Sequence, residues 1–223
     1  MNKCNNPSIG RKPLQLDHSH PKSITSPKQS CELAEFLGIY YGDGSATENP
    51  PVVTVSLSYS DEYVYARYVS ELVREVFGVN AGFVEHKIVN NIQVRVYRIS
   101  LVRYLKTTAD RSQGVPNWVK CDSGFLSSFI RGVMDCESSV YRVERGKKRI
   151  RLELKMTNKR LLQDVHMGLY SLGYHPRIYL KRNRVTIARQ NEVDRYFKEI
   201  CSHNPKHMKR YLSLREKPFP KLR

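Results

Sequence analysis

Hydrophobic and polar positions along the chain repeat with two different periods, which together predict a mixture of helices and strands. Apolar residues at helical spacing predict a first helix over 31–43. The stretch VVTVSLSYS, residues 52–60, alternates strictly and predicts a half-buried strand. Its outward side chains are Thr54, Ser56 and Ser58.

Further along, the same two periods predict three more elements of the first half. A helix is expected over 60–78, with Ser60 as its cap and Gly78 as its stop. Asn90-Asn91 lies between two extended runs and predicts a hairpin over 81–100. A short helix over 101–109 completes this series.

The order of elements then recurs, which predicts an internal repeat. The second series consists of a helix over 124–139, a hairpin over 140–157 that turns at Gly146-Lys147, a helix over 158–173 ended by Gly173, a hairpin over 174–190 that turns at Asn183, and a helix over 191–201 followed by a basic tail. We therefore expect a mixed α/β (α+β) fold made of two αββαββα halves. The expected divisions are an N-terminal arm over 1–30, a first half over 31–109, a linker over 110–122 and a second half with its tail over 123–223.

The net charge of the chain indicates the kind of partner that it binds. The chain of 223 residues has 38 Lys and Arg against 21 Asp and Glu, a formal net charge of +17. Such an imbalance favours a polyanion such as nucleic acid. A merely basic ribosomal or chromatin protein remains an alternative.

Other classes of protein fit the sequence poorly. No run approaches the length of a membrane-spanning helix, and the N-terminus lacks the apolar middle of a signal peptide. The five cysteines are widely spaced, which argues against a zinc ribbon and against a disulfide scaffold. We expect a cytoplasmic protein with no membrane partner.

The first helix of each half carries small residues in a matching pattern. Aligning the two helices with an offset of 94 places Gly38 on Gly132, Gly42 on Cys136, and Asp43 on Glu137. Small residues four apart lie on one helix face and allow a close helix contact. We expect the two helices to pack along this stripe.

That contact would bring Asp43 and Glu137 together at neighbouring helix C-termini. Both the helix dipoles and the opposite acid disfavour ionisation there. A divalent, oxygen-preferring cation such as Mg²⁺ would compensate for both effects. The sequence therefore predicts a metal site between the two acids.

These residues carry a family resemblance. FLGIYYGDG and IRGVMDCES resemble the two motifs of the LAGLIDADG homing endonucleases, in their single-chain, two-motif form. The resemblance extends from Cys31 to about Tyr211. The second motif departs from the usual pattern, with Glu137 for aspartate and Ser138 for glycine.

The resemblance implies a pseudo-twofold saddle of two four-stranded antiparallel sheets around the motif helices. It implies a monomer that makes a staggered double-strand break in a long DNA site and promotes intron mobility. Mg²⁺, with Mn²⁺ as a substitute, would be held at Asp43 and Glu137 with their neighbours Gly42 and Cys136. Further catalytic residues expected by the resemblance are Asp61, Asn158 and Lys209, with Lys206 as the alternative to Lys209 and Lys120 as a weaker candidate in the first half. Asp61 and Asn158 fit the role of helix caps equally well.

A DNA-reading sheet needs apolar residues on its core side and polar or basic residues on its groove side. RIRLELKM, residues 149–156, alternates in this way. The predicted DNA-binding residues are Thr54, Ser56, Ser58, Gln93, Arg95, Arg142, Arg145, Arg149, Arg151, Glu153, Lys155, Arg177, Tyr179, Lys181, Arg184 and Thr186. We expect more base contacts from the first half and more phosphate attraction from the second.

Two alternatives share the same fold. One is an RNA maturase, and the other is a sequence-specific DNA-binding protein that does not cleave. A pure binder has no need of two adjacent carboxylates facing phosphates, so the acid pair favours a nuclease.

Overall fold

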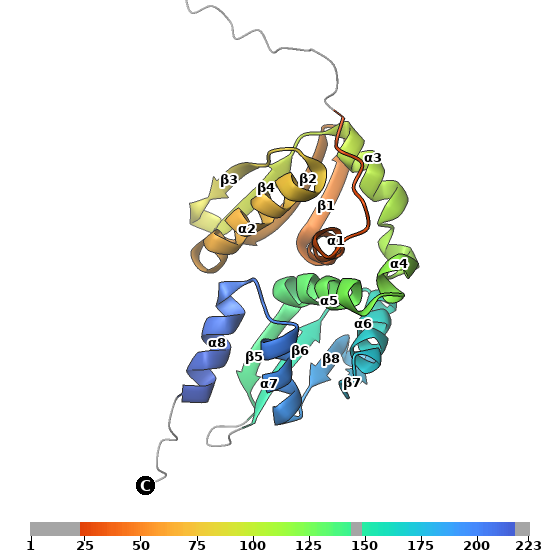
Figure 1. Cartoon of the computed structure of the whole chain (residues 1–223). Coiled ribbons are helices and arrows are strands. Elements are labelled where there is room, and N and C mark those ends of the chain that lie inside the picture. Colours follow the sequence, from red (N-terminus) through yellow and green to blue (C-terminus); the bar gives the residue numbers. More distant parts are fainter. Residues whose placement is uncertain (1–22, 144–148, 217–223) are drawn as a thin grey trace, which may run out of the picture.

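Two halves of one topology face each other across a pair of central helices in the computed structural model, which describes residues 23–143 and 149–216 (Figure 1). The first half consists of α1 (Cys31–Asp43), β1 (Gly44–Glu48), β2 (Pro51–Ser58), α2 (Tyr59–Phe77), β3 (Gly82–His86), β4 (Asn91–Val96) and α3 (Ile99–Thr108). The second consists of α5 (Ser123–Glu137), β5 (Ser138–Arg142), β6 (Ile150–Lys155), α6 (Lys159–Ser171), β7 (Arg177–Tyr179), β8 (Arg184–Ile187) and α7 (Gln190–Glu199). A turn of 3-10 helix at Arg111–Gln113 and α4 (Asn117–Lys120) connect the halves, and α8 (Pro205–Glu216) follows α7.

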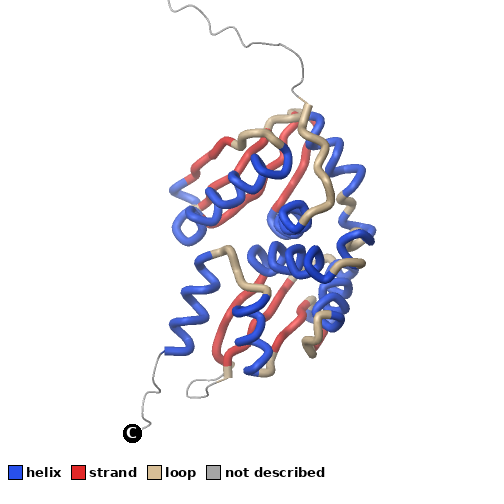
Figure 2. The backbone as a smooth tube through the Cα atoms, viewed as in Figure 1, coloured by secondary structure: helices blue, strands red, loops and turns tan. Residues whose placement is uncertain are grey.

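Each half contains one four-stranded antiparallel sheet, as expected. The strand orders are β1-β2-β4-β3 and β5-β6-β8-β7. The sheets lie on opposite sides of α1 and α5, and further helices cover their core faces (Figure 2). The turn before β4 and the turn before β8 both end on an asparagine in the left-handed conformation, Asn90 and Asn183. The predicted turn at Gly146-Lys147, Arg145 and residues 1–22 of the predicted arm lie outside the described residues.

Alternation along the strands sorts core from surface as the sequence predicts. Val53, Val55 and Leu57 are buried in β2. Their counterparts in β6 are Ile150, Leu152 and Leu154, each at most 1% exposed. Burying such side chains contributes about 1.5–3 kcal/mol each, so a one-residue slip of register would be strongly unfavourable.

Three sequence expectations need correction. The sequence pattern assigned no residues to the first strand of the expected αββαββα half, because GSATE is short and does not alternate; this strand is β1, which pairs with β2 and has Ser45 opposite Thr54. The cap of α2 is Ser58 and not Ser60, which lies inside the first turn. Residues 205–216 of the predicted basic tail form a helix, α8, which packs against β5 and α2.

No helix within residues 23–143 and 149–216 has the length and apolarity needed to cross a membrane.

Candidate active site and nucleic-acid interface

α1 and α5 touch through the glycines that the sequence singles out. A Cβ on Gly38 would overlap the carbonyl oxygen of Phe129, and one on Gly132 would overlap that of Glu35. A Cβ on Gly42 would lie 2.6 Å from the Cβ of Cys136. Only glycine allows this backbone approach, so the predicted helix contact is confirmed.

The contact places two acids at adjacent helix ends. α1 ends at Asp43 and α5 at Glu137, and neither helix has a basic residue in its last turn. Burial first, and then the charge of Glu137, raise the pKa of Asp43 to about 6. Burial also raises the pKa of Glu137, while the Arg111 guanidinium lowers it. The carboxylate of Glu137 is therefore close enough to Asp43 to raise its pKa.

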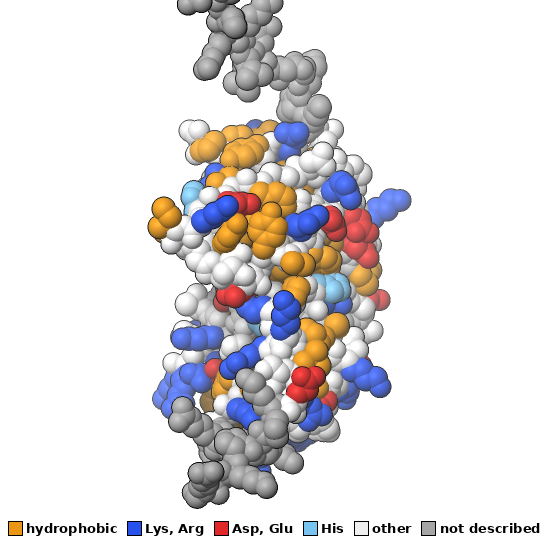
Figure 3. Space-filling model, turned by 90° about the vertical axis from the view of Figure 1, so that its left-hand side faces the viewer, with side chains coloured by type: hydrophobic (Ala, Val, Ile, Leu, Met, Phe, Trp, Pro, Cys, Tyr) orange, Lys and Arg blue, Asp and Glu red, His pale blue; other side chains and the backbone are white. Residues whose placement is uncertain are grey.

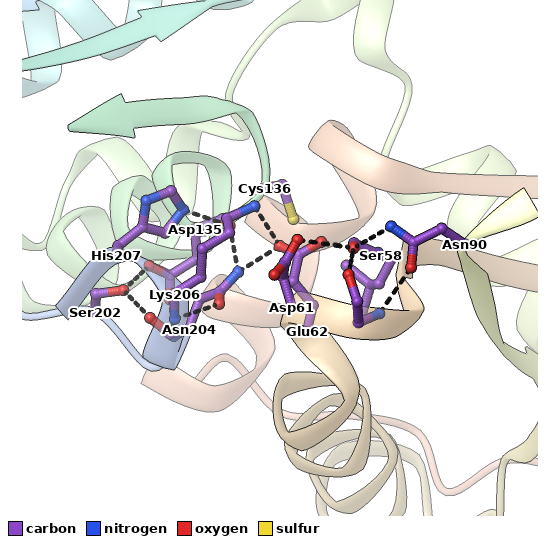
Figure 4. Close-up of polar contacts among 12 residues, drawn as sticks. Ser58, Asp61, Glu62, Asn90, Asp135, Cys136, Ser202, Asn204, Lys206 and His207 are labelled. Atoms are coloured by element: carbon purple, nitrogen blue, oxygen red, sulfur yellow. Dashed lines mark hydrogen bonds and ion pairs between the residues drawn. The ribbon is translucent and has the colours of Figure 1, made fainter. Parts of the chain in front are cut away.

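A third acid, which sequence reasoning missed, lies beside Asp43. Glu62 is 5% exposed and departs from helical backbone angles in the first turn of α2, at φ −124° and ψ 16°. Its carboxylate accepts hydrogen bonds from the Ser58 N–H at 2.9 Å and from the Asn204 amide at 2.6 Å (Figure 4). The sequence signal that could have found Glu62 is its position directly after Asp61, in the first turn of the predicted helix.

Lys206 completes this side of the site. Its ammonium lies 2.7 Å from Glu62 Oε1 and lowers the pKa of Asp43 (Figure 4). The predicted Lys209 is exposed on α8, whereas its alternative Lys206 faces the acids. Lys120 is 3.0 Å from Asp164 and so belongs to an ion pair elsewhere.

Arg111 has the equivalent place beside Glu137. Its guanidinium donates to the carbonyl oxygens of Tyr40 and Gly44 at the end of α1 and lies 4.7 Å from the Tyr40 ring centroid. Sequence reasoning assigned residue 111 to a linker, and no local pattern marks it.

The two predicted water-orienting residues differ in their surroundings. Asn158 caps α6, because its Oδ1 accepts from the Leu161 N–H at 3.0 Å, and its amide donates to the Arg111 carbonyl. The capping role of Asn158 is thus confirmed. Asp61 is exposed, and its carboxylate accepts from the Ser58 hydroxyl at 3.3 Å rather than from a backbone N–H (Figure 4).

Buried polar groups hold the segment after α7 against both motif helices. Asp135, which is 1% exposed, accepts from the Ser202 hydroxyl and from the N–H groups of His203 and Asn204. Burial raises the pKa of Asp135 to about 7. Glu35 of α1 binds Arg131 of α5 at 2.5 Å and His203 at 2.7 Å. This network positions α8 and therefore Lys206.

An oxygen-preferring divalent ion fits between Asp43 and Glu137. The two carboxylates have the same charge, which Lys206 and Arg111 offset only in part, because the pKa values of both acids remain raised. Hard oxygen ligands suit Mg²⁺, which needs only one or two protein carboxylates beside water and phosphate. Gly42 and Cys136 precede the acids at the helix contact; the Cys136 thiol, held protonated by burial that raises its pKa, is no natural Mg²⁺ ligand. Among the described residues no cluster of three His, Cys, Asp or Glu side chains forms a richer metal site.

The predicted DNA-binding residues lie mostly on the outward faces of the two sheets. Facing pairs include Ser56 with Gln93 and Glu153 with Thr186. Lys181 lies in a 3-10 turn rather than in a strand. Figure 3 shows Lys and Arg side chains gathered mainly over the lower part of the molecule, where the second half lies.

Several of the predicted DNA-binding residues are engaged within the protein. Thr186 is 3% exposed and donates to Glu153 Oε2, which also accepts from Tyr141 and Arg184. The Arg142 guanidinium donates to the Leu214 carbonyl of α8. Little of Thr186 is therefore left for a ligand, while Glu153 fixes the position of the Arg184 guanidinium.

Comparisons with known proteins agree with this geometry. Residues 124–201 match the model of the LAGLIDADG-like domain. No curated protein sequence matches significantly. Most of the second half of the chain is therefore similar to a LAGLIDADG-like domain.

Solved structures extend the likeness to both halves. Mesophilic variants of the homing endonuclease I-DmoI are 18% identical with a TM-score of 0.53, covering 77% of this chain and 95% of that one. I-DmoI in complex with DNA and Mn is 19% identical with a TM-score of 0.53, covering 77% and 97%. The N-terminal LAGLIDADG domain of DUF199/WhiA is 15% identical with a TM-score of 0.56, covering 80% and 88%. At these identities the likeness shows the fold alone: the chain has the two-motif LAGLIDADG fold.

Proposed function

We propose that this protein is a site-specific DNA endonuclease of the homing type, which hydrolyses phosphodiesters in double-stranded DNA with the help of a divalent metal ion. The observation that carries the proposal is the pairing of Asp43 and Glu137 at the contact of α1 and α5, where each lacks a basic neighbour in its own helix turn. The I-DmoI complexes with DNA and Mn, and with DNA and Ca, support a divalent ion at such a site. Mg²⁺ is the ion we propose for this chain, with Mn²⁺ as a substitute.

In this mechanism Asp43 and Glu137 would hold the metal, each mainly serving one DNA strand. A bound divalent ion supplies Lewis-acid stabilisation of the charge that develops on the phosphate and on the leaving oxygen. Lys206 and Arg111 offset the charge of the two acids from opposite sides. Asp61, whose carboxylate is exposed, is better placed to orient a water molecule than Asn158, whose amide already caps α6.

The outward faces of the two sheets would bind the duplex as a monomer. Polar side chains such as Ser56 and Gln93 suit base edges, and the basic residues of β6 to β8 suit phosphates. We propose intron mobility as the biological role and the cell interior as the place of action, because the substrate is genomic DNA.

A binder that does not cleave is the second candidate function. It is favoured by the likeness to the DUF199/WhiA domain, whose TM-score of 0.56 is slightly above that of I-DmoI, and by the departures Glu137 and Ser138 in the second motif. A variant of this candidate binds RNA, as a maturase does.

A cleavage-site selection distinguishes the candidates. The protein is incubated with a plasmid library of randomised or genomic inserts in Mg²⁺, and in parallel in Mn²⁺, and linearised products are sequenced. We expect a recurrent staggered break with the wild type and none with Asp43→Asn. A protein that retains one recurrent sequence in a binding selection but linearises nothing in either metal would be a binder.

A further inference from the structure

A pocket of about 380 Å³ lies at the outer end of the second sheet, away from Asp43 and Glu137. It is lined by Arg149, Arg151, His175, Arg177, Arg189 and Gln190, together with Ala188. These residues come from the beginnings of β6 and β7 and from the segment that leads from β8 into α7. Four guanidinium groups around one pocket are costly unless an anion is held between them.

Little within the protein neutralises these charges. Among the described residues, no ion pair involves the side chain of Arg149 or Arg177. Within residues 23–143 and 149–216, the carboxylate that forms ion pairs with members of the pocket is Glu192, 5% exposed on its side chain, which binds Arg189 at 3.2 Å and His175 at 2.7 Å. Glu192 therefore orients two members of the pocket and leaves the other guanidiniums without an acid.

The start of α7 adds to the attraction for an anion. Arg189 is the N-cap residue of this ten-residue helix. Its guanidinium has no acceptor atom, so it does not cap the N–H groups of the first turn. The N–H groups at a helix start and the helix dipole favour negative charge. The pocket thus combines guanidiniums with a helix N-terminus.

Among the described residues, the first sheet carries no arginine at the positions that match Arg151 and Arg177. The turns at Asn90 and Asn183 align the two sheets, so Val84, which faces Gln93, matches Arg177, which faces Thr186. In the same alignment Val55, which faces Val94, matches Leu152, which faces Ile187, so Thr54 matches Arg151. The anion site is therefore confined to one half of the molecule.

We propose that this arginine pocket binds one backbone phosphate of the duplex, beyond the bases that the second sheet faces, and so anchors the DNA on that side only. The inference rests on the proposed binding of double-stranded DNA but not on cleavage. A phosphodiester suits the guanidinium fork better than a carboxylate or chloride does, because planar donors match its oxygens in pairs.

Ethylation interference tests the proposal. The probe is a duplex recovered by binding selection from a randomised library, used in EDTA so that no cleavage occurs. With the wild type we expect interference at phosphates on one outer flank. Arg149→Ala with Arg177→Ala should remove that flank signal, keep the inner signals, and make the log–log salt dependence of affinity shallower by about one, because one phosphate contact is lost.

A matched control removes the same charge elsewhere. Arg67 and Arg74 are exposed on α2, outside the sheets, so Arg67→Ala with Arg74→Ala should leave the flank signal in place. An unchanged flank signal in the pocket variant, or equal losses in both variants, would overturn the proposal. Failure of the wild type to retain any duplex would defeat the proposed function as well, whereas binding without cleavage would leave this inference intact.

Inorganic phosphate separates DNA from a small ligand as the source of the anion. We expect calorimetric titration of the wild type with inorganic phosphate to show no saturable site. A saturable site that Arg149→Ala with Arg177→Ala abolishes, together with an unchanged interference pattern, would assign the pocket to a small phosphate ligand instead.

Discussion

The two sheets have the same strand order, yet their outward faces differ in chemistry. Aligned on Asn90 and Asn183, the outward residues Thr54, Ser58, Val84 and Asn91 of the first sheet match Arg151, Lys155, Arg177 and Arg184 of the second. The inward residues of the central strands β2, β4, β6 and β8 are apolar in both. Core packing therefore fixes one face of each strand, and the other face is free to specialise.

The surroundings of the two acids differ in the same way. Asp43 has Glu62 and Lys206 as neighbours, whereas Glu137 has Arg111. Each cation comes from the segment that follows the last helix of the repeat unit, and each segment touches the start of the other half's second helix, at Asn158 or at Glu62. The pseudo-symmetry preserves this docking while the side chains change.

The largest expected effect is the loss of DNA cleavage when either acid is neutralised, and it compares the roles of the two acids. Asp43→Asn or Glu137→Gln should lower double-strand cleavage by about 10³-fold or more, because each removes a charged metal ligand. Binding should change little. Strand-resolved gels would show whether the two variants nick opposite strands; wild-type rates in both would refute the site.

The next effect tests whether the halves depend on close backbone contact. Gly38→Ala and Gly132→Ala each place a Cβ against a carbonyl oxygen of the facing helix, so we expect each to lower the free energy of unfolding by about 3 kcal/mol. Gly82→Ala is the control, since its added Cβ would lie 4.0 Å from the nearest neighbouring atom, the carbonyl oxygen of Arg95. Denaturant unfolding measures both, and equal stability of all three variants would contradict the contact.

A third prediction uses the titration of Asp43. Its pKa is raised from 3.8 to about 6 in the folded chain, so its contribution to stability is present below pH 3.8 and is lost as the pH rises through 6. Without metal, wild type should therefore lose stability relative to Asp43→Asn between about pH 4 and 6. Mg²⁺ binds the ionised form, so it should raise the wild-type Tm more at pH 7 than at pH 5 and have no such effect on the variant.

A smaller effect compares the two cations. Lys206→Met should raise the pKa of Asp43, and Arg111→Met that of Glu137, because each removes a charge that lowers it. We expect about a tenfold slower cleavage of one strand in each variant at pH 7, with recovery at higher pH. The same strand slowed in both variants would contradict the division of roles.

The smallest effect compares the outward faces at single positions. Gln93→Ala should weaken the preference at one base position, while Lys155→Ala should lower affinity for all sequences alike and reduce the salt slope by about one. Binding selections and salt titrations with both variants measure this. Similar changes in both would remove the distinction between a base-reading and a phosphate-binding half.

Sequence patterns predicted the elements whose signals are local. α1, α5 and the alternation of β2 and β6 follow from periodicity, and the pairing of Gly38 with Gly132 follows from the repeat. The position of β1 was missed because its five residues, GSATE, show no alternation and become a strand only by pairing with β2. α8 was missed because its buried residues, His207 and Leu214, leave no apolar stripe to detect.

The residues of the candidate site also differ in whether a local sequence signal marks them. Asp43 and Glu137 could be found because each ends a recognisable helix. Lys206 was reached only through the family resemblance, as the alternative to Lys209, and Arg111 was not reached, because they come to the acids from a segment after the last repeat helix and from a connection. Glu62 lies at the start of the next helix of the same half as Asp43, and the folding of that half brings these two acids together.

By itself, the sequence determined the repeat, the inward and outward faces of the strands and the two acids at the helix ends, because each depends on residues a few positions apart. Only the tertiary structure decided which cations stand beside which acid, that Glu153 is committed to Arg184 and Thr186, and that four arginines surround one pocket. These follow from the distances between folded segments, and a period along a single chain carries no such distances.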